Sequence, residues 1–64
     1  MTEQDLLRIE ACIRNMRKIA EPVGPMHSLW DWIAEMEEVR SGNQGMLADM
    51  TTGEKIAHCE SLIG

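Results

Sequence analysis

The stretch TEQDLLRIEACIRNMRKIAEPVGP, residues 2–25, decides the fold, because it combines a regular helical pattern with an abrupt break. Thr2 is a good capping residue for the start of a helix, whereas Pro22 and Gly24 favour an end near Glu21. At about 100° per residue, the apolar side chains between these ends fall within one arc. That arc consists of Leu6, Ile9, Cys12, Ile13, Met16, Ile19 and Ala20. The stretch therefore predicts a long amphipathic helix followed by a sharp turn.

Two further helices are predicted after this turn. The first begins at Ser28, a preferred N-cap residue with Asp31 three positions later, and ends at about Arg40 or Ser41 before Gly42. Its buried stripe is Leu29, Trp32, Ile33, Met36 and Val39. The second starts near Thr51 or Thr52, because TTGE at residues 51–54 fits a capping box. Its apolar side is Ile56, Cys59, Leu62 and Ile63. Residues 46–50, between the two helices, can make one short turn.

The fold class follows from these elements and from the length of the chain. No segment alternates between apolar and polar residues as a strand does. We therefore expect a single all-α domain over residues 1–64, a compact three-helix mini-domain. Chains of this size bury only about 60% of the surface that their unfolded form exposes, so their stability is marginal. Self-association supplies additional buried area, and we predict a homodimer.

The charge and hydropathy of the chain argue against two classes of partner, nucleic acids and membranes. The net charge is −5, which argues against binding to nucleic acid phosphates. Residues 1–20 carry four basic and three acidic residues, whereas residues 21–64 carry two basic and eight acidic ones. No apolar run is long enough to span a membrane. Two cysteines without a secretory signal favour reduced thiols, and we expect a cytoplasmic protein.

The residues that bear chemistry do not form a recognisable site. The candidate metal ligands are Cys12, His27, His58 and Cys59. They lack the paired spacing of zinc ligands, and the helical pattern places Cys59 inward, where a thiol is unreactive. Three short helices also leave little room for an enclosed catalytic cleft. We therefore expect no metal, no cofactor and no enzymatic activity.

Trp30 is the most function-like feature of the sequence. It lies two residues before Trp32, so the two indoles point about 160° apart on one helix, and only Trp32 belongs to the buried stripe. Trp30 is either covered by the 22–26 turn or exposed as an interface anchor. The second interpretation predicts a partner-binding surface centred on Trp30. Its remaining members are Ala34 and Glu37, flanked by an acidic stripe of Asp31, Glu35 and Glu38.

The stripe itself has two interpretations, a solvated outer face or a surface complementary to a basic partner. The second leads to the predicted function, a small acidic inhibitor or adaptor that occupies the surface of another protein. One form would be a phage-type inhibitor that masks the nucleic-acid-binding site of a basic enzyme. The alternative is a helix-turn-helix DNA-binding regulator, in which the last helix would contact DNA. Lys55 is the only Lys or Arg on that helix, which also carries Glu54 and Glu60.

Overall fold

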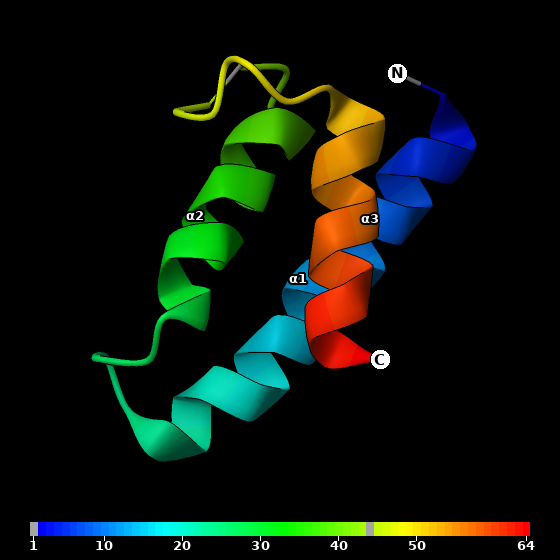
Figure 1. Cartoon of the computed structure of the whole chain (residues 1–64). Helices are drawn as coiled ribbons and strands as arrows, with labels where there is room; N and C mark the ends of the chain where they lie inside the picture. The colour runs from blue at the N-terminus through cyan, green and yellow to red at the C-terminus, as the bar shows by residue number, and fades with distance from the viewer. Residues whose placement is uncertain (1, 44) are drawn as a thin grey trace.

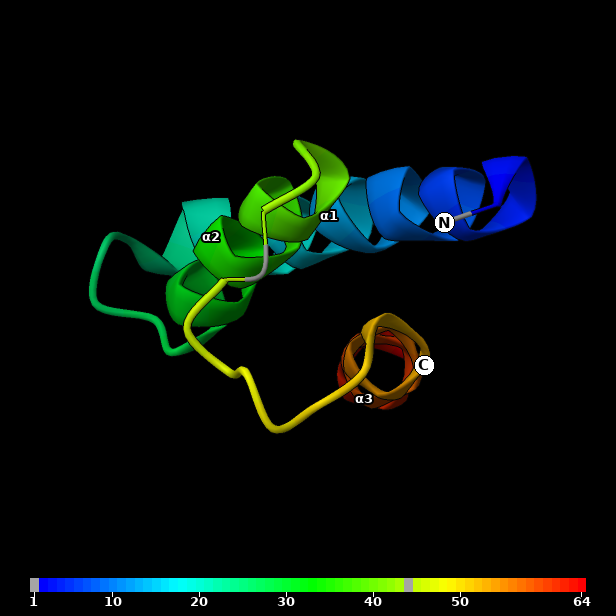
Figure 2. The same cartoon turned by 90° about the horizontal axis from the view of Figure 1, so that it is seen from above.

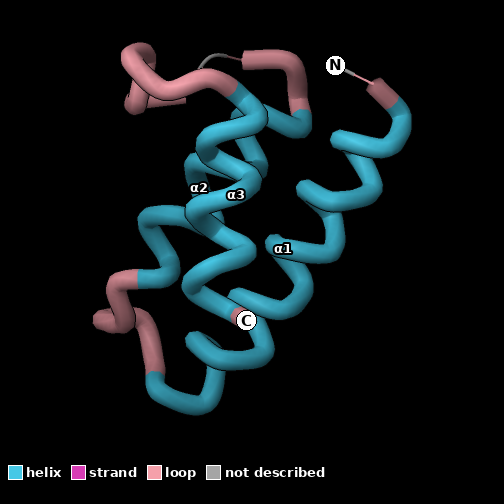
Figure 3. Tube along the Cα trace, turned by 45° about the vertical axis from the view of Figure 1, so that its right-hand side comes forward, coloured by secondary structure: helices cyan, strands magenta, loops and turns pink. Residues whose placement is uncertain are grey.

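Three α-helices form the fold of the computed structural model, which describes residues 2–43 and 45–64. They are α1 (Glu3–Val23), α2 (Leu29–Arg40) and α3 (Thr52–Ile63). Consecutive helices run in opposite directions, and the two connections lie at opposite ends of the bundle (Figures 1 and 3). The described residues contain no strand, so the predicted all-α three-helix mini-domain is confirmed.

Helix α1 is the longest element and contacts both of the others. Seen from above, it runs across the molecule beside α2, while α3 is viewed almost along its axis (Figure 2). The Arg8 guanidinium ties α1 to α3, because its Nε donates to Glu60 Oε2 at 3.1 Å and a second N–H donates to the other carboxylate oxygen. This contact holds the pKa of Glu60 below its ordinary value.

The predicted cap of α1 is confirmed, but its predicted end is two residues short. The Thr2 hydroxyl accepts the Asp5 backbone N–H at 3.1 Å, and the helix then continues through Pro22 to Val23. Pro22 has no N–H to donate, so the backbone hydrogen bond to the Lys18 carbonyl is absent in this turn. Gly24 ends the helix with φ of 113°, and its N–H donates to the Ala20 carbonyl at 3.0 Å.

The predicted cap of α2 is wrong. Ser28 already has helical dihedral angles, φ −63° and ψ −23°, and its side chain makes no capping bond. A capping side chain needs the extended backbone that precedes a helix, so Ser28 and Asp31 do not form a capping box. The His27 ring takes the role instead, because its Nδ1 accepts the Leu29 N–H at 3.1 Å.

The other predicted boundaries agree with the structure. Gly42, with φ of 90°, follows α2, and the Asn43 N–H donates to the Glu38 carbonyl at 2.9 Å in a Schellman motif. The Thr51–Glu54 capping box is present, since the Glu54 N–H donates to the Thr51 hydroxyl and the Thr51 N–H to the Glu54 carboxylate. Before it, residues 47–50 make one turn through a bond from the Met50 N–H to the Leu47 carbonyl.

The core lies where the three helices meet. Its largest fully buried side chains are Ile9, Cys12, Met16, Ile33, Met36, Ile56 and Cys59. Five predicted core residues are less buried than expected: Ile19 and Leu62 are 40% and 43% exposed, and Leu6, Trp32 and Ile63 are only partly buried. Helix α3 has 12 residues against 21 in α1, so it leaves part of the apolar arc of α1 uncovered.

Candidate functional site

Glu35 departs most from the sequence prediction, which placed it with Asp31 and Glu38 on an exposed stripe. Its side chain is 3% exposed and forms an ion pair with the equally buried Lys55, at 3.0 Å from Nζ to Oε2. The backbone N–H groups of Met46 and Leu47 donate to the same carboxylate at 2.9 and 3.1 Å. The expectation of an exposed Glu35 is therefore corrected, since the charge is compensated inside the protein.

This buried carboxylate fastens the α2–α3 loop to α2. The Met46 N–H, together with Lys55 and the Leu47 N–H, lowers the pKa of Glu35 against the opposing effect of burial. Within the described residues, every buried side-chain nitrogen and oxygen has a hydrogen-bond partner. The ion pair is thus a structural element, and Glu35 has no free oxygen to offer an external partner.

Gly45 allows the loop to approach this carboxylate. Its φ is 77°, and a Cβ atom at this position would lie 2.5 Å from Glu35 Oε2. Any other residue would therefore combine left-handed backbone strain with a collision. Met46, the next residue of the loop, lines two hollows together with residues of α2.

These two hollows form one surface, which we call the Met46 groove. They have volumes of about 530 and 410 Å³ and share Glu35 and Met46. Four of the six predicted partner-binding residues line them, namely Asp31, Ala34, Glu35 and Glu38. The other lining residues were not among the predicted partner-binding residues; they are Trp32, Asn43, Gly45, Met46 and Leu47. The groove therefore joins α2 to a loop that the helical pattern could not place.

The groove is apolar at its centre and acidic at its rim. Met46 is 82% exposed, and the Trp32 ring is partly buried with its centroid 4.4 Å from that of His58. Asp31 and Glu38 are exposed at the rim. Glu38 accepts a hydrogen bond from the Asn43 amide at 2.8 Å, whereas Asp31 has no ion-pair partner within residues 2–43 and 45–64.

Trp30 and Glu37 lie outside the Met46 groove. The Trp30 indole N–H donates to the Gly24 carbonyl at 2.9 Å, and the ring packs against the core. It lines a separate hollow of about 350 Å³ beside the α1–α2 turn, with Glu21, Gly24 and Pro25. Glu37 pairs with Arg40 at 4.0 Å. Of the two interpretations of Trp30, this hydrogen bond to Gly24 favours cover by the 22–26 turn.

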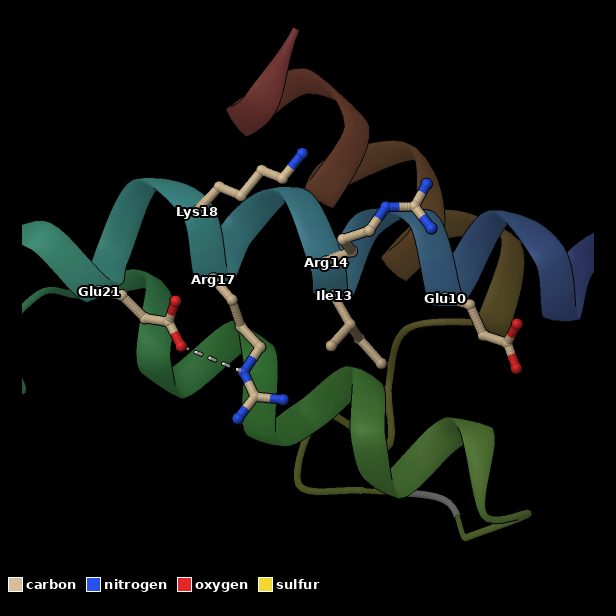
Figure 4. Close-up of a pocket in the computed structure, with 6 residues that line it drawn as sticks. All are labelled: Glu10, Ile13, Arg14, Arg17, Lys18 and Glu21. Atoms are coloured by element: carbon tan, nitrogen blue, oxygen red, sulfur yellow. Dashed lines mark ion pairs between the residues drawn. The ribbon is translucent and has the colours of Figure 1, made fainter.

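A further hollow of about 350 Å³ on α1 gathers three cations, Arg14, Arg17 and Lys18 (Figure 4). Their side chains do not converge, since Arg17 points to the opposite side of the helix from Lys18. Arg17 is 4.0 Å from Glu21, and Glu10 also lines the hollow. All of its lining residues come from one helix, so the arrangement does not enclose an anion.

The thiols and histidines have structural surroundings. Cys12 and Cys59 are free and buried, and burial raises the pKa of both thiols, that of Cys59 to about 12. Both therefore remain protonated, and unreactive as nucleophiles, at neutral pH. In the described part of the chain, no group of three His, Cys, Asp or Glu residues is arranged to hold a metal ion. Nor does any helix there have the length and apolar character needed to cross a membrane.

Comparison with known proteins adds no family to this description. Models of protein families, curated proteins and solved structures were all searched, and none matches the chain.

Proposed function

We propose that the protein is a non-enzymatic binding module, an acidic inhibitor or adaptor whose Met46 groove holds a basic segment of another protein. The observation that supports this proposal is the combination of an exposed apolar centre with an acidic rim. Met46 is 82% exposed, and Asp31 and Glu38 stand exposed on the helix beside it. An exposed apolar surface rimmed by polar residues is typical of interaction sites.

The two parts of the groove contribute differently to binding. Covering Met46, Leu47 and the accessible part of Trp32 removes apolar surface from water, which stabilises the complex. Methionine adapts to partners of varied shape because it is unbranched and flexible. The carboxylates at the rim raise the association rate and select a basic partner. A nucleic-acid-binding enzyme has such a basic surface, so an inhibitor that masks it is one form of the proposed function.

The helix-turn-helix alternative has less support. Lys55, the only Lys or Arg of α3, is 3% exposed and paired with Glu35, so it is not available to a phosphate. The other charged side chains of α3 are the acidic Glu54 and Glu60. The connection between α2 and α3 spans residues 41–51, whereas helix-turn-helix motifs use three or four residues.

The test compares two charge-reversed variants in affinity capture from the native host, followed by reconstitution. Asp31→Lys/Glu38→Lys reverses the rim of the groove, and Glu10→Lys/Glu21→Lys makes the same change of net charge on α1. We expect a basic protein that wild type and the α1 variant retain and the groove variant loses. With purified components, the groove variant should bind at least about tenfold more weakly, because like charges then face each other.

Two outcomes would contradict the proposal. Equal loss of the captured protein in both variants would mean that net charge, and not the groove, governs binding. Binding of a random DNA duplex at low salt, with an affinity that falls steeply as salt rises, would instead favour the DNA-binding alternative.

A further inference from the structure

We infer that the hollow beside Trp32 is a subsite for an arginine side chain from the basic partner. This inference rests on the proposed function and assigns a ligand to one half of the Met46 groove. The hollow has a volume of about 410 Å³ and is lined by Asp31, Trp32, Glu35, Met46 and Leu47. Its lining therefore combines an aromatic ring, a thioether, an aliphatic side chain and two carboxylates.

Of the two carboxylates, only that of Asp31 is available to a ligand. Both Glu35 oxygens already accept hydrogen bonds, from Lys55 and from the Met46 and Leu47 N–H groups. Asp31 is exposed and makes no ion pair with any residue that the structure describes. Within that part of the chain, Lys55 pairs with Glu35 and Arg40 with Glu37, so neither forms an ion pair with Asp31.

The chemistry of the lining fits a guanidinium better than other cations. A guanidinium is planar and weakly hydrated, so it can stack on an indole ring while its edge donates to a carboxylate. An ammonium is a strongly hydrated point charge and loses more on leaving water. Met46 and Leu47 can pack along the aliphatic part of the arginine side chain, which stays in contact with apolar surface while its head remains polar.

The two tryptophans give the experiment an internal reference. We would label the indole nitrogens with ¹⁵N, assign the two N–H signals with Trp30→Phe, and titrate with N-acetyl-arginine amide. The Trp32 signal should shift saturably, whereas the Trp30 signal should stay in place because its N–H is held by the Gly24 carbonyl. The matching citrulline amide, which has nearly the same shape and no charge, should leave both signals unchanged.

Variants then test the role of Asp31. Asp31→Asn should weaken the apparent affinity for the arginine probe about two- to fivefold, the usual range for an exposed ion pair. Glu10→Gln, which makes the same change of charge on α1, should have no effect. N-acetyl-lysine amide should shift the Trp32 signal less than the arginine probe at equal concentration.

Several results would overturn the inference. They are the absence of a Trp32 shift, an equal shift with citrulline, an equal shift of both indoles, and equal effects of arginine and lysine. If any of these occurs while the captured partner still depends on Asp31 and Glu38, the subsite is wrong and the proposed function stands. If the arginine probe binds as described but charge reversal at the rim leaves partner binding unchanged, the proposed function is wrong instead.

Discussion

At the residue scale, Glu35 and Lys55 show how strongly surroundings alter the role of a charge. The pair is 3% exposed on each side, so removing Lys55 leaves a buried carboxylate without its cation, held only by the two loop N–H groups. Breaking a buried pair in this way costs about 3–5 kcal/mol. We expect Lys55→Met to abolish or strongly lower the cooperative thermal transition measured by circular dichroism.

The control for this prediction is Lys18→Met, which removes an exposed cation from α1 and should change stability by less than about 0.5 kcal/mol. The double variant Glu35→Gln/Lys55→Met should be more stable than Lys55→Met alone, because no buried charge is left over and the Gln amide oxygen can still accept a loop N–H. Equal stability of Lys55→Met and Lys18→Met would contradict the assignment of a buried pair.

Gly45 and Gly42 form a second comparison between single residues. Both have positive φ, 77° and 90°, but only at Gly45 would a Cβ meet another atom, Glu35 Oε2 at 2.5 Å. Gly42→Ala should therefore cost only the strain of a left-handed alanine, about 1 kcal/mol. Gly45→Ala should cost at least about 2 kcal/mol, because the loop or the carboxylate must also move. Urea unfolding of the two variants measures these costs. Equal costs would show that the close approach of Gly45 to Glu35 adds nothing to the strain of a left-handed alanine.

At the element scale, the residue that caps the start of α2 differs from the one that the sequence predicts. The His27 Nδ1 accepts the Leu29 N–H, whereas Ser28 makes no side-chain bond to the helix. We expect His27→Ala to lower the free energy of unfolding by about 1 kcal/mol, as the loss of a cap does. Ser28→Ala should leave it nearly unchanged. Urea unfolding in which Ser28→Ala is the more damaging change would restore serine as the cap.

The helices themselves were predictable because their signals are local. The Thr51–Glu54 capping box and Gly42 are visible in a few consecutive residues, and the structure has both where they were expected. The end of α1 was predicted too early because a proline makes a helix boundary before it probable but not certain, and α1 continues through Pro22 to Val23. His27 was missed because histidine is not among the preferred capping residues.

The candidate site was only partly predictable, because it depends on distant pairs. Glu35 has the same spacing as its exposed neighbours, and only the approach of Lys55, 20 positions later, makes it a buried residue. Trp32 was assigned to the core, yet α3 leaves its ring partly open beside His58. Gly45 is the one residue whose type indicates part of the site in the sequence, since a second glycine so soon after Gly42 marks a loop with unusual backbone geometry.

At the scale of the whole molecule, three carboxylates should determine the response to acid. The pKa values of Glu35, Glu54 and Glu60 lie below the ordinary value of 4.5 in the folded protein. The causes are chiefly the Met46 N–H, the Thr51 N–H and the Arg8 guanidinium. Because the unfolded chain binds protons more readily, their contribution is present above the ordinary pKa and is lost as the pH falls through the folded values.

We therefore expect the midpoint of urea unfolding to be constant near neutral pH and to fall progressively below about pH 4.5, the region where unfolded carboxyl groups titrate. Glu60→Gln should make this decline shallower, because it removes one of the three carboxylates from an exposed position. Glu10→Gln is the matched control and should follow the wild-type curve. A midpoint that stays constant or rises on acidification would contradict the three assignments.

Self-association is the last prediction, and the structure suggests where to test it. Val23 and Met26, at the α1–α2 turn, are 67% and 94% exposed, beside the hollow that Trp30 lines. A chain of this size gains stability by covering such residues with a second copy. We expect sedimentation to show a monomer–dimer equilibrium that Met26→Gln shifts toward monomer without altering helicity. Met46→Gln, a matched change at the other connection between helices, should leave the equilibrium unchanged while weakening the arginine probe. A wild-type monomer at all concentrations would contradict the dimer, and equal effects of the two variants would move the contact away from the turn.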